Sequence, residues 1–283
     1  MTYDTTLTVA PTGEPLHVDH VKLHCGIWDT DRDALLAAWI TAAREDAQAR
    51  TNQQLLHARY ALRLAEFPAA CGDERPRWAE GAIVLPHWPV TDVVSVQYVD
   101  ADGATQTIAA ADYELHSDGA PAFVVPAYGV SWPSTREGPA AVIVTYNAGY
   151  ASVATANAGA DTLTVTGPRT WAVDAPVRLS VSGGPTAALP APRAAGTTYY
   201  IKTAAAGVYT LAATAGGATI DLTDTGSGRI FIGEIPAGFL SWMLLQVGSL
   251  ADVRAETEVV ERGTLTTAPF VDRLLDRLRV WLP

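Results

Sequence analysis

The chain has 283 residues, 48% of them hydrophobic, and a formal net charge of −11. This length is enough for two ordinary domains with apolar cores, whereas the acidic balance excludes a nucleic-acid-wrapping surface, which needs clustered lysine and arginine. The longest apolar stretch, 239–250, is far shorter than the roughly 20 residues of a membrane span, and residues 1–10 lack a signal-peptide pattern, so we expect a soluble protein with no membrane partner.

Two helices are predicted near the start of the chain. Val18, Val21 and Cys25 recur at helical spacing, which indicates a short helix within residues 15–26. A second apolar face, with acidic residues early in the segment, predicts a long helix over residues 33–52.

From residue 58 the apolar pattern changes to a period of two, which is typical of strands. Asp102 and Gly103 stand between two alternating runs and predict a hairpin turn. We therefore expect a small antiparallel sheet packed against the helices. The predicted strands are 58–64, 83–85, 93–99, 106–108, 123–125 and 141–146.

The segment 151–233 differs in kind from its flanks. Its net charge is +1, against −10 for residues 1–150 and −2 for residues 234–283. It is rich in Ala, Thr and Gly, shows no helical period, and has glycine turns between short alternating runs, which predicts a small all-β module. The predicted strands are 162–165, 177–182, 198–202, 208–212 and 219–222.

After Pro236 an apolar face predicts another helix, over residues 237–256, and an apolar segment with several arginines closes the chain. The fold class that we expect is α+β. One domain, residues 1–150 plus 234–283, combines a helical bundle with a small antiparallel sheet or hairpin. The second, residues 151–233, is an inserted all-β domain.

Motifs for catalysis or for metals are weak. His17, His20 and His24 would share one face of a helix, yet no fourth ligand is evident, so we interpret them as capping and solvated residues. Asp100 and Asp102 lack the closing glutamate of a calcium loop and fit a turn. No nucleophile elbow, phosphate loop or zinc-protease motif is present. We expect no catalytic, cofactor-binding or metal site, no cofactor, and no enzyme.

Outside the segment 151–233, ordered pieces along the chain resemble the head–tail adaptor (head-completion, head–tail connector) proteins of tailed bacteriophages. No single piece is specific, but their order is. The pieces are Pro15-Leu16-x-Val18-x-x-Val21-Lys22-x-His24, Leu35-Leu36-x-x-Trp39-Ile40-x-Ala42-Ala43-Arg44-Glu45, Leu85-Pro86-x-x-Pro89-Val90, Ser95-Val96-x-Tyr98-Val99-Asp100-x-Asp102-Gly103, Trp132-Pro133-x-Thr135-Arg136, Val142-x-Val144-x-Tyr146-x-Ala148-Gly149-Tyr150, Ile235-Pro236-Ala237, Arg254-x-Glu256 and Leu274-Leu275-x-x-Leu278-Arg279-Val280. The segment 151–233 departs from this pattern and looks like a β-module that recurs in phage structural proteins.

The resemblance implies a structural role in the virion neck, after assembly in the bacterial cytoplasm. The expected partners are the portal protein, further copies of the chain in a ring of twelve, and a stopper, neck or tail-completion protein. DNA would pass through the ring without specific binding. The module would brace the neck against the capsid, contact a decoration protein, or be a dispensable appendage. The alternatives are another neck-ring protein, such as a stopper or tail terminator, or a ligand- or glycan-binding virion protein that acts through the module.

The C-terminal segment is the expected portal-docking site. It is too apolar for a free tail, and aromatic and arginine side chains are typical interface anchors. The alternative is that this segment folds back onto the core of its own chain. The candidate contacts are Phe270, Leu274, Leu275, Leu278, Arg279, Val280 and Trp281.

Overall fold

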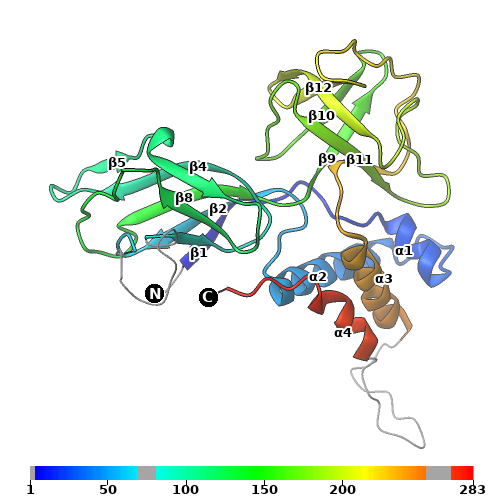
Figure 1. Cartoon of the computed structure of the whole chain (residues 1–283). Helices are drawn as coiled ribbons and strands as arrows, with labels where there is room; N and C mark the ends of the chain where they lie inside the picture. Colours follow the sequence, from blue (N-terminus) through cyan, green and yellow to red (C-terminus); the bar gives the residue numbers. More distant parts are fainter. Residues whose placement is uncertain (1–3, 69–80, 253–268, 283) are drawn as a thin grey trace, which may run out of the picture. The chain divides into compact units, whose positions relative to one another are not determined.

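The computed structural model describes residues 4–68, 81–252 and 269–282, and the side chains of 4–68, 81–251 and 273–282 (Figure 1). The fold is α+β, as predicted. The chain divides into two compact units. We call residues 1–10, 52–149 and 280–283 the sheet unit, and residues 11–51 and 150–279 the barrel unit.

The sheet unit holds two antiparallel sheets. The first has the strand order β1-β2-β8-β4-β5 and the second the order β3-β7-β6. Its described strands are β1 (Asp4–Val9), β2 (Ala58–Leu64), β3 (Ile83–Leu85), β4 (Val90–Val99), β5 (Thr105–Thr107), β6 (Tyr113–His116), β7 (Ala122–Pro126) and β8 (Val142–Ala148), and a 3₁₀ turn lies at Ala110–Asp112.

Alternation along the central strands places one apolar face of each in a shared core. Leu62, Val96 and Val144 are fully buried there, in one cluster with Ile83 and Val124 of the smaller sheet. The core therefore joins the two sheets of this unit.

The predicted turn at Asp102-Gly103 is confirmed. Asp100 Oδ1 accepts hydrogen bonds from the backbone nitrogens of Asp102 and Ala104, at 3.1 and 2.9 Å. Gly103 has a φ of +87°, which a glycine adopts without strain. The turn connects β4 to β5 as an Asx-type hairpin.

The barrel unit begins with helices α1 (Val18–Cys25) and α2 (Asp33–Thr51) and ends with α3 (Ala237–Asp252) and α4 (Pro269–Asp276). Both N-terminal helices agree with the prediction. His17 Nδ1 accepts a hydrogen bond from the backbone nitrogen of Asp19 at the start of α1, and Gly26, at a φ of +66°, ends it. Residues 253–256, the predicted end of α3, lie outside the described residues.

Residues 151–233 form a closed antiparallel barrel with the strand order β10-β13-β12-β11-β14-β9. Closure leaves the barrel without a free edge strand. Its interior is apolar and centres on Leu163, Leu179, Ile201, Leu211 and Ile232. The strands are β9 (Ala151–Asn157), β10 (Thr162–Val165), β11 (Pro176–Ser182), β12 (Thr198–Ala205), β13 (Val208–Ala212) and β14 (Arg229–Gly233).

One predicted strand is wrong. Residues 219–222 form only an isolated bridge, Ala212↔Thr219, although Leu222 is buried in the barrel core. Four strands were missed, namely β1, β6, β9 and β14. β9 is built mostly of Ala, Ser and Thr, and its small side chains give little apolar contrast between its two faces.

The barrel unit contains the described helices α1 to α4 together with the barrel. The predicted domains group the helices with the sheet instead. Compactness does not show which segments fold independently. The division into a domain of residues 1–150 plus 234–283 and an inserted domain of residues 151–233 therefore stays a prediction.

Candidate functional site

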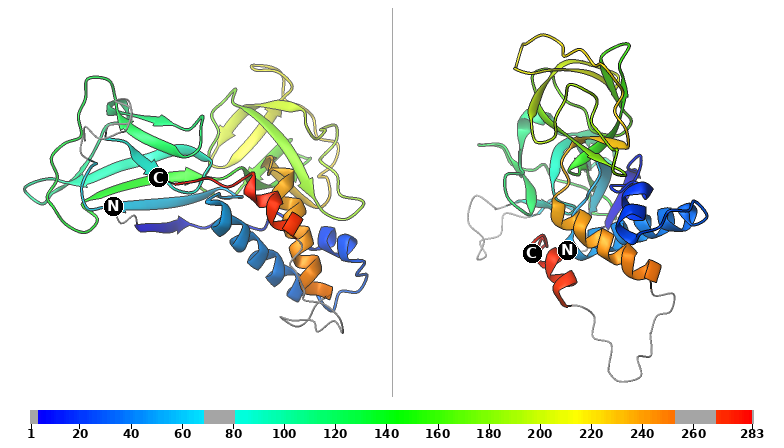
Figure 2. Two further views of the ribbon diagram at one scale, coloured as in Figure 1. Left: turned by 60° about the horizontal axis from the view of Figure 1, so that its bottom comes forward. Right: turned by 90° about the vertical axis from the view of Figure 1, so that its right-hand side faces the viewer.

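The C-terminal segment carries the predicted portal contacts. The structure places α4 against α3, as Figure 2 shows. Leu275 and Val280 are buried, at 4% and 5% exposure, and Leu274 and Leu278 are half-buried. Arg279 and Trp281 are exposed, Trp281 at 70%. The side chain of Phe270 lies outside the described residues.

Close packing of α4 on α3 explains this burial. A Cβ atom added at Gly238 of α3 would lie 3.1 Å from Leu278 Cδ1. In this conformation the chain itself covers Leu275 and Val280, so an incoming partner reaches Arg279 and Trp281 instead. The buried members of the predicted set hold the segment in place.

A second surface feature lies beside α1. A cavity of about 400 Å³ is lined by one face of α1, by Ile27 and Trp28, and by barrel turns at residues 184–187 and 227–228. We call it the Trp28 groove. Trp28 is 79% exposed, and Leu23 beside it is also exposed. Such large apolar side chains in a hollow are typical of binding surfaces.

Charge around the Trp28 groove is acidic. Lys22, its one lining lysine, is held by Asp33, with 2.9 Å between Nζ and Oδ1. Asp19 lines the groove, and exposed Asp29 and Asp31 follow Trp28 in the loop.

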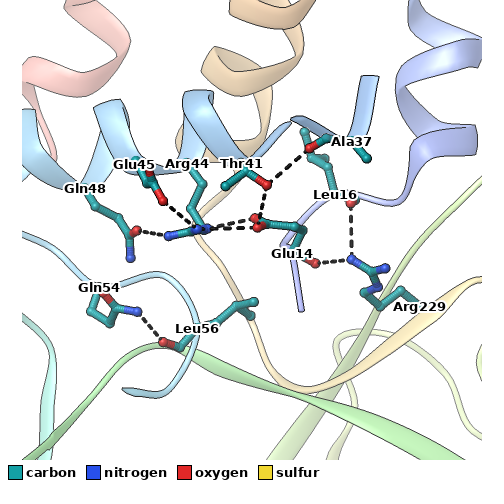
Figure 3. Close-up of polar contacts among 10 residues, drawn as sticks. All are labelled: Glu14, Leu16, Ala37, Thr41, Arg44, Glu45, Gln48, Gln54, Leu56 and Arg229. Carbon is teal, nitrogen blue, oxygen red and sulfur yellow. Dashed lines mark hydrogen bonds and ion pairs between the residues drawn. The ribbon is translucent and has the colours of Figure 1, made fainter. Parts of the chain in front are cut away.

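A polar cluster ties the N-terminal segment to both α2 and the barrel (Figure 3). Arg44 Nε of α2 donates to Glu14 Oε2 at 2.7 Å, and Thr41 Oγ1 donates to Glu14 Oε1 at 2.9 Å. From β14, Arg229 Nη1 donates to the backbone oxygens of Glu14 and Leu16 at 2.8 and 3.5 Å. Burial lowers the pKa of Arg229, an effect that Glu14 opposes.

Three further contacts join α1 and the segment before it to the barrel. Ser182 Oγ of β11 accepts a hydrogen bond from the backbone nitrogen of His17 at 3.0 Å and lies 3.2 Å from His20 Nδ1. Thr12 Oγ1 also donates to the backbone oxygen of Thr166 at 2.5 Å. The barrel is thus fastened to the segment that leads into the helices.

The three histidines considered as metal ligands have separate roles. His17 caps α1, His20 meets Ser182, and His24 lies against Gly248 of α3. Burial, and then the charge of His24, lower the pKa of His20. Among the described residues, no three His, Cys, Asp or Glu side chains gather as metal ligands would.

Sequence reasoning did not predict that Glu14 and Arg229, which lie 215 residues apart, are hydrogen-bonding partners. The one available signal was Arg229 itself, an arginine at the start of the apolar run 230–232 in an almost uncharged segment. In the described part of the chain, none of the helices is long and apolar enough to cross a membrane.

Residues 16–114 match the family described as phage gp6-like head-tail connector protein. None of the curated proteins matches the chain. A chain in the structure "Virion of native gene transfer agent (GTA) particle" shares 16% identity with a TM-score of 0.54, covering 99% of this chain and 96% of that chain. A chain in "Neck of empty GTA particle computed with C6 symmetry" shares 18% identity with a TM-score of 0.52, covering 100% and 97%. The likeness of fold thus extends across residues 151–233 as well as their flanks.

Proposed function

We propose that this chain, whose residues 16–114 match the phage gp6-like head–tail connector family, is the head–tail adaptor of a virion neck. The family match carries the proposal. The fold shared with chains of gene transfer agent particles over nearly the whole length supports it. The role is one of binding and geometry, in keeping with a structural family, and involves no catalysis.

The adaptor forms a ring, of twelve copies in our proposal, that docks on the portal protein and offers a platform for a stopper, neck or tail-completion protein. A ring built from one chain uses head-to-tail contacts, so each subunit needs two different complementary surfaces. The Trp28 groove and the α4 segment are two such surfaces on the barrel unit.

Docking on the portal uses the exposed end of the C-terminal segment. Trp281 and Leu282 are exposed apolar side chains beside Arg279, a composition typical of interface anchors. Leu275 and Val280, which are buried, act by fixing the position of this end. Asn52 adds to this, because its Nδ2 donates to the backbone oxygen of Val280 at 2.9 Å.

DNA passes through the ring without specific binding. The net charge of −10 in residues 1–150 repels phosphate, and the whole chain carries −11. A fluorescent duplex DNA should show no binding to the purified ring at physiological salt; micromolar affinity would contradict this part of the proposal.

The barrel braces the neck against a capsid or decoration protein. A glycan-binding role has less support, because Tyr199 and Tyr209 are buried in the barrel and Trp171 packs edge-on against Tyr209. Trp171 and Tyr200 are half-buried, so these aromatic side chains expose little ring face on which a sugar could stack.

Negative-stain microscopy of the chain mixed with the portal protein of the same virus tests the adaptor role. We expect a ring stacked on one end of the portal. Trp281→Ala, and truncation after Val280, should weaken docking at least about tenfold, because a buried aromatic anchor contributes 2 kcal/mol or more. These changes spare Leu275 and Val280, which a longer truncation would remove from the core.

Tyr128→Ala is the matched control, since Tyr128 is a fully exposed aromatic residue on a loop of the sheet unit. Docking by this variant should equal that of the wild type. Absence of any ring on the portal at all concentrations would sink the adaptor role, whereas normal docking by Trp281→Ala and by the truncated chain would overturn only the docking segment.

A further inference from the structure

We propose that the Trp28 groove of one copy binds α4 of the neighbouring copy through Arg273 and Arg277, so that these two surfaces form the head-to-tail contact of the ring. This inference rests on the proposed function. It names the contact between subunits, which is separate from docking on the portal.

The Trp28 groove presents an acceptor for arginine. Trp28 lines the groove and is 79% exposed, and exposed Asp29, Asp31 and Arg32 follow it in the loop. Neither carboxylate has a hydrogen-bonding or ionic partner among the described residues, in contrast to Asp33, which holds Lys22. An exposed indole beside two unpartnered carboxylates suits a guanidinium, which stacks on the ring and bonds the carboxylate oxygens.

Helix α4 presents the complementary surface. Arg273 lies in its last turn and Arg277 directly follows its last residue, and both side chains are exposed, unlike Leu275, which is buried. Neither arginine has a partner in the described part of the chain. Within the described residues, the end of α4 thus presents two arginines without partners, beside exposed Asp276, and the loop at the rim of the groove presents two carboxylates without partners, beside exposed Arg32.

The two surfaces lie on opposite flanks of the helical layer. α1 and α4 each pack against α2 and α3, and α3 lies between them in Figures 1 and 2. A subunit with complementary surfaces on opposite sides associates head to tail, the arrangement that closes rings. Complementary surfaces on one flank would instead favour a closed pair.

Charge reversal in two variants tests the contact. Asp29→Arg with Asp31→Arg makes the groove basic, and Arg273→Asp with Arg277→Asp makes α4 acidic. Either variant alone then presents like charges to its own copies, and self-association measured by analytical ultracentrifugation should weaken at least about tenfold. Mixed in equal amounts, the two variants are complementary at both contacts and should associate in alternation, restoring the wild-type assembly.

The mixing experiment also controls for folding, because a misfolded variant would not recover on mixing. Asp102→Arg with Asp118→Arg makes the same change of net charge at exposed positions of the sheet unit, and should associate as the wild type does. If the wild type forms rings only on the portal, ring formation by the same variants is measured by negative-stain microscopy in the presence of the portal protein.

Unchanged assembly by either reversed variant, or failure of the mixture to recover, would overturn the contact while leaving the adaptor role intact. Loss of portal binding with self-association unchanged would assign the groove to the portal and also overturn the inference. A wild-type chain that neither self-associates nor binds the portal would remove the proposed function itself.

Discussion

Arg229 Nη1 donates a hydrogen bond of 2.8 Å to the backbone oxygen of Glu14, across 215 residues of sequence. The same guanidinium reaches the backbone oxygen of Leu16, and the Glu14 carboxylate is held by Arg44 of α2. One half-buried arginine of β14 therefore orders the backbone of the segment that precedes α1, and that segment is bonded in turn to α2.

Arg229→Ala should lower the free energy of unfolding by about 1–3 kcal/mol, because it removes charge-assisted hydrogen bonds and leaves two backbone oxygens short of a donor. Urea unfolding followed by tryptophan fluorescence measures this. Arg178→Ala is the control, since Arg178 makes an exposed ion pair with Glu234 and such pairs contribute about 0–1 kcal/mol. Equal losses in the two variants would contradict a special role for Arg229.

His87 should make the sheet unit sensitive to acid. Its ring stacks on Tyr60 with 3.9 Å between centroids, and burial lowers the pKa of His87 from 6.5 to about 4. Because the folded pKa lies below the unfolded one, the unfolded chain binds more protons between pH 6.5 and 4. The free energy of unfolding therefore falls as the pH drops through this window, by about 3 kcal/mol at its lower end.

Urea unfolding at pH 7 and pH 4 measures this dependence. His87→Asn suits the position, because asparagine tolerates the left-handed φ of +67° and does not titrate. The difference in stability between wild type and variant should therefore shrink as the pH falls. A constant difference would show that protonation of His87 does not drive the loss.

Gly149 joins β8 to the next strand at a point of close approach. Its φ is +139°, and an added Cβ atom would lie 2.6 Å from the backbone nitrogen of His57. Gly149→Ala should cost about 2–4 kcal/mol of unfolding free energy or prevent folding, since the backbone segments at Gly149 and His57 cannot easily move apart. Gly129→Ala isolates the conformational part, because Gly129 also has a positive φ but nothing lies within 4 Å of its added Cβ, and it should cost about 1 kcal/mol. Similar behaviour of both variants would rule out the steric explanation.

Replacing Arg193 with an apolar residue should stabilise the protein. Its side chain is 6% exposed, burial lowers its pKa, and its three guanidinium nitrogens have no hydrogen-bond acceptor in the described part of the chain. Arg193→Met should raise the free energy of unfolding by about 1–3 kcal/mol, since it replaces a buried charge that lacks hydrogen-bond acceptors with an apolar side chain. Arg193→Lys retains the charge and should bring no gain. Destabilisation by the methionine, measured by thermal unfolding, would indicate that the guanidinium contributes to the barrel.

Local sequence patterns determined much of the secondary structure. The long helix α2 agrees with its prediction to within a residue, because its apolar face repeats at helical spacing over nineteen residues. The β4–β5 hairpin was predictable because Asp100 and Gly103 determine a turn by their own chemistry. The resemblance to connector proteins also depended only on the order of residues along the chain.

The tertiary structure alone decided which elements belong together. β9 became a strand because β10 and β14 pair with it and close the barrel, although its small side chains carry little strand signal of their own. Residues 219–222 alternate like a strand, yet only Thr219 forms a bridge to the barrel strands.

For the candidate surfaces too, the sequence determined one part and the tertiary structure another. Composition indicated that the C-terminal segment is apolar and basic, but packing of α4 on α3 decided that Leu275 is buried and Trp281 exposed. The Trp28 groove combines α1 with barrel turns more than 150 residues away along the chain. A periodic pattern reports the faces of one element, whereas contacts between distant segments depend on the free energy of the whole packed chain, and so only the folded structure shows them.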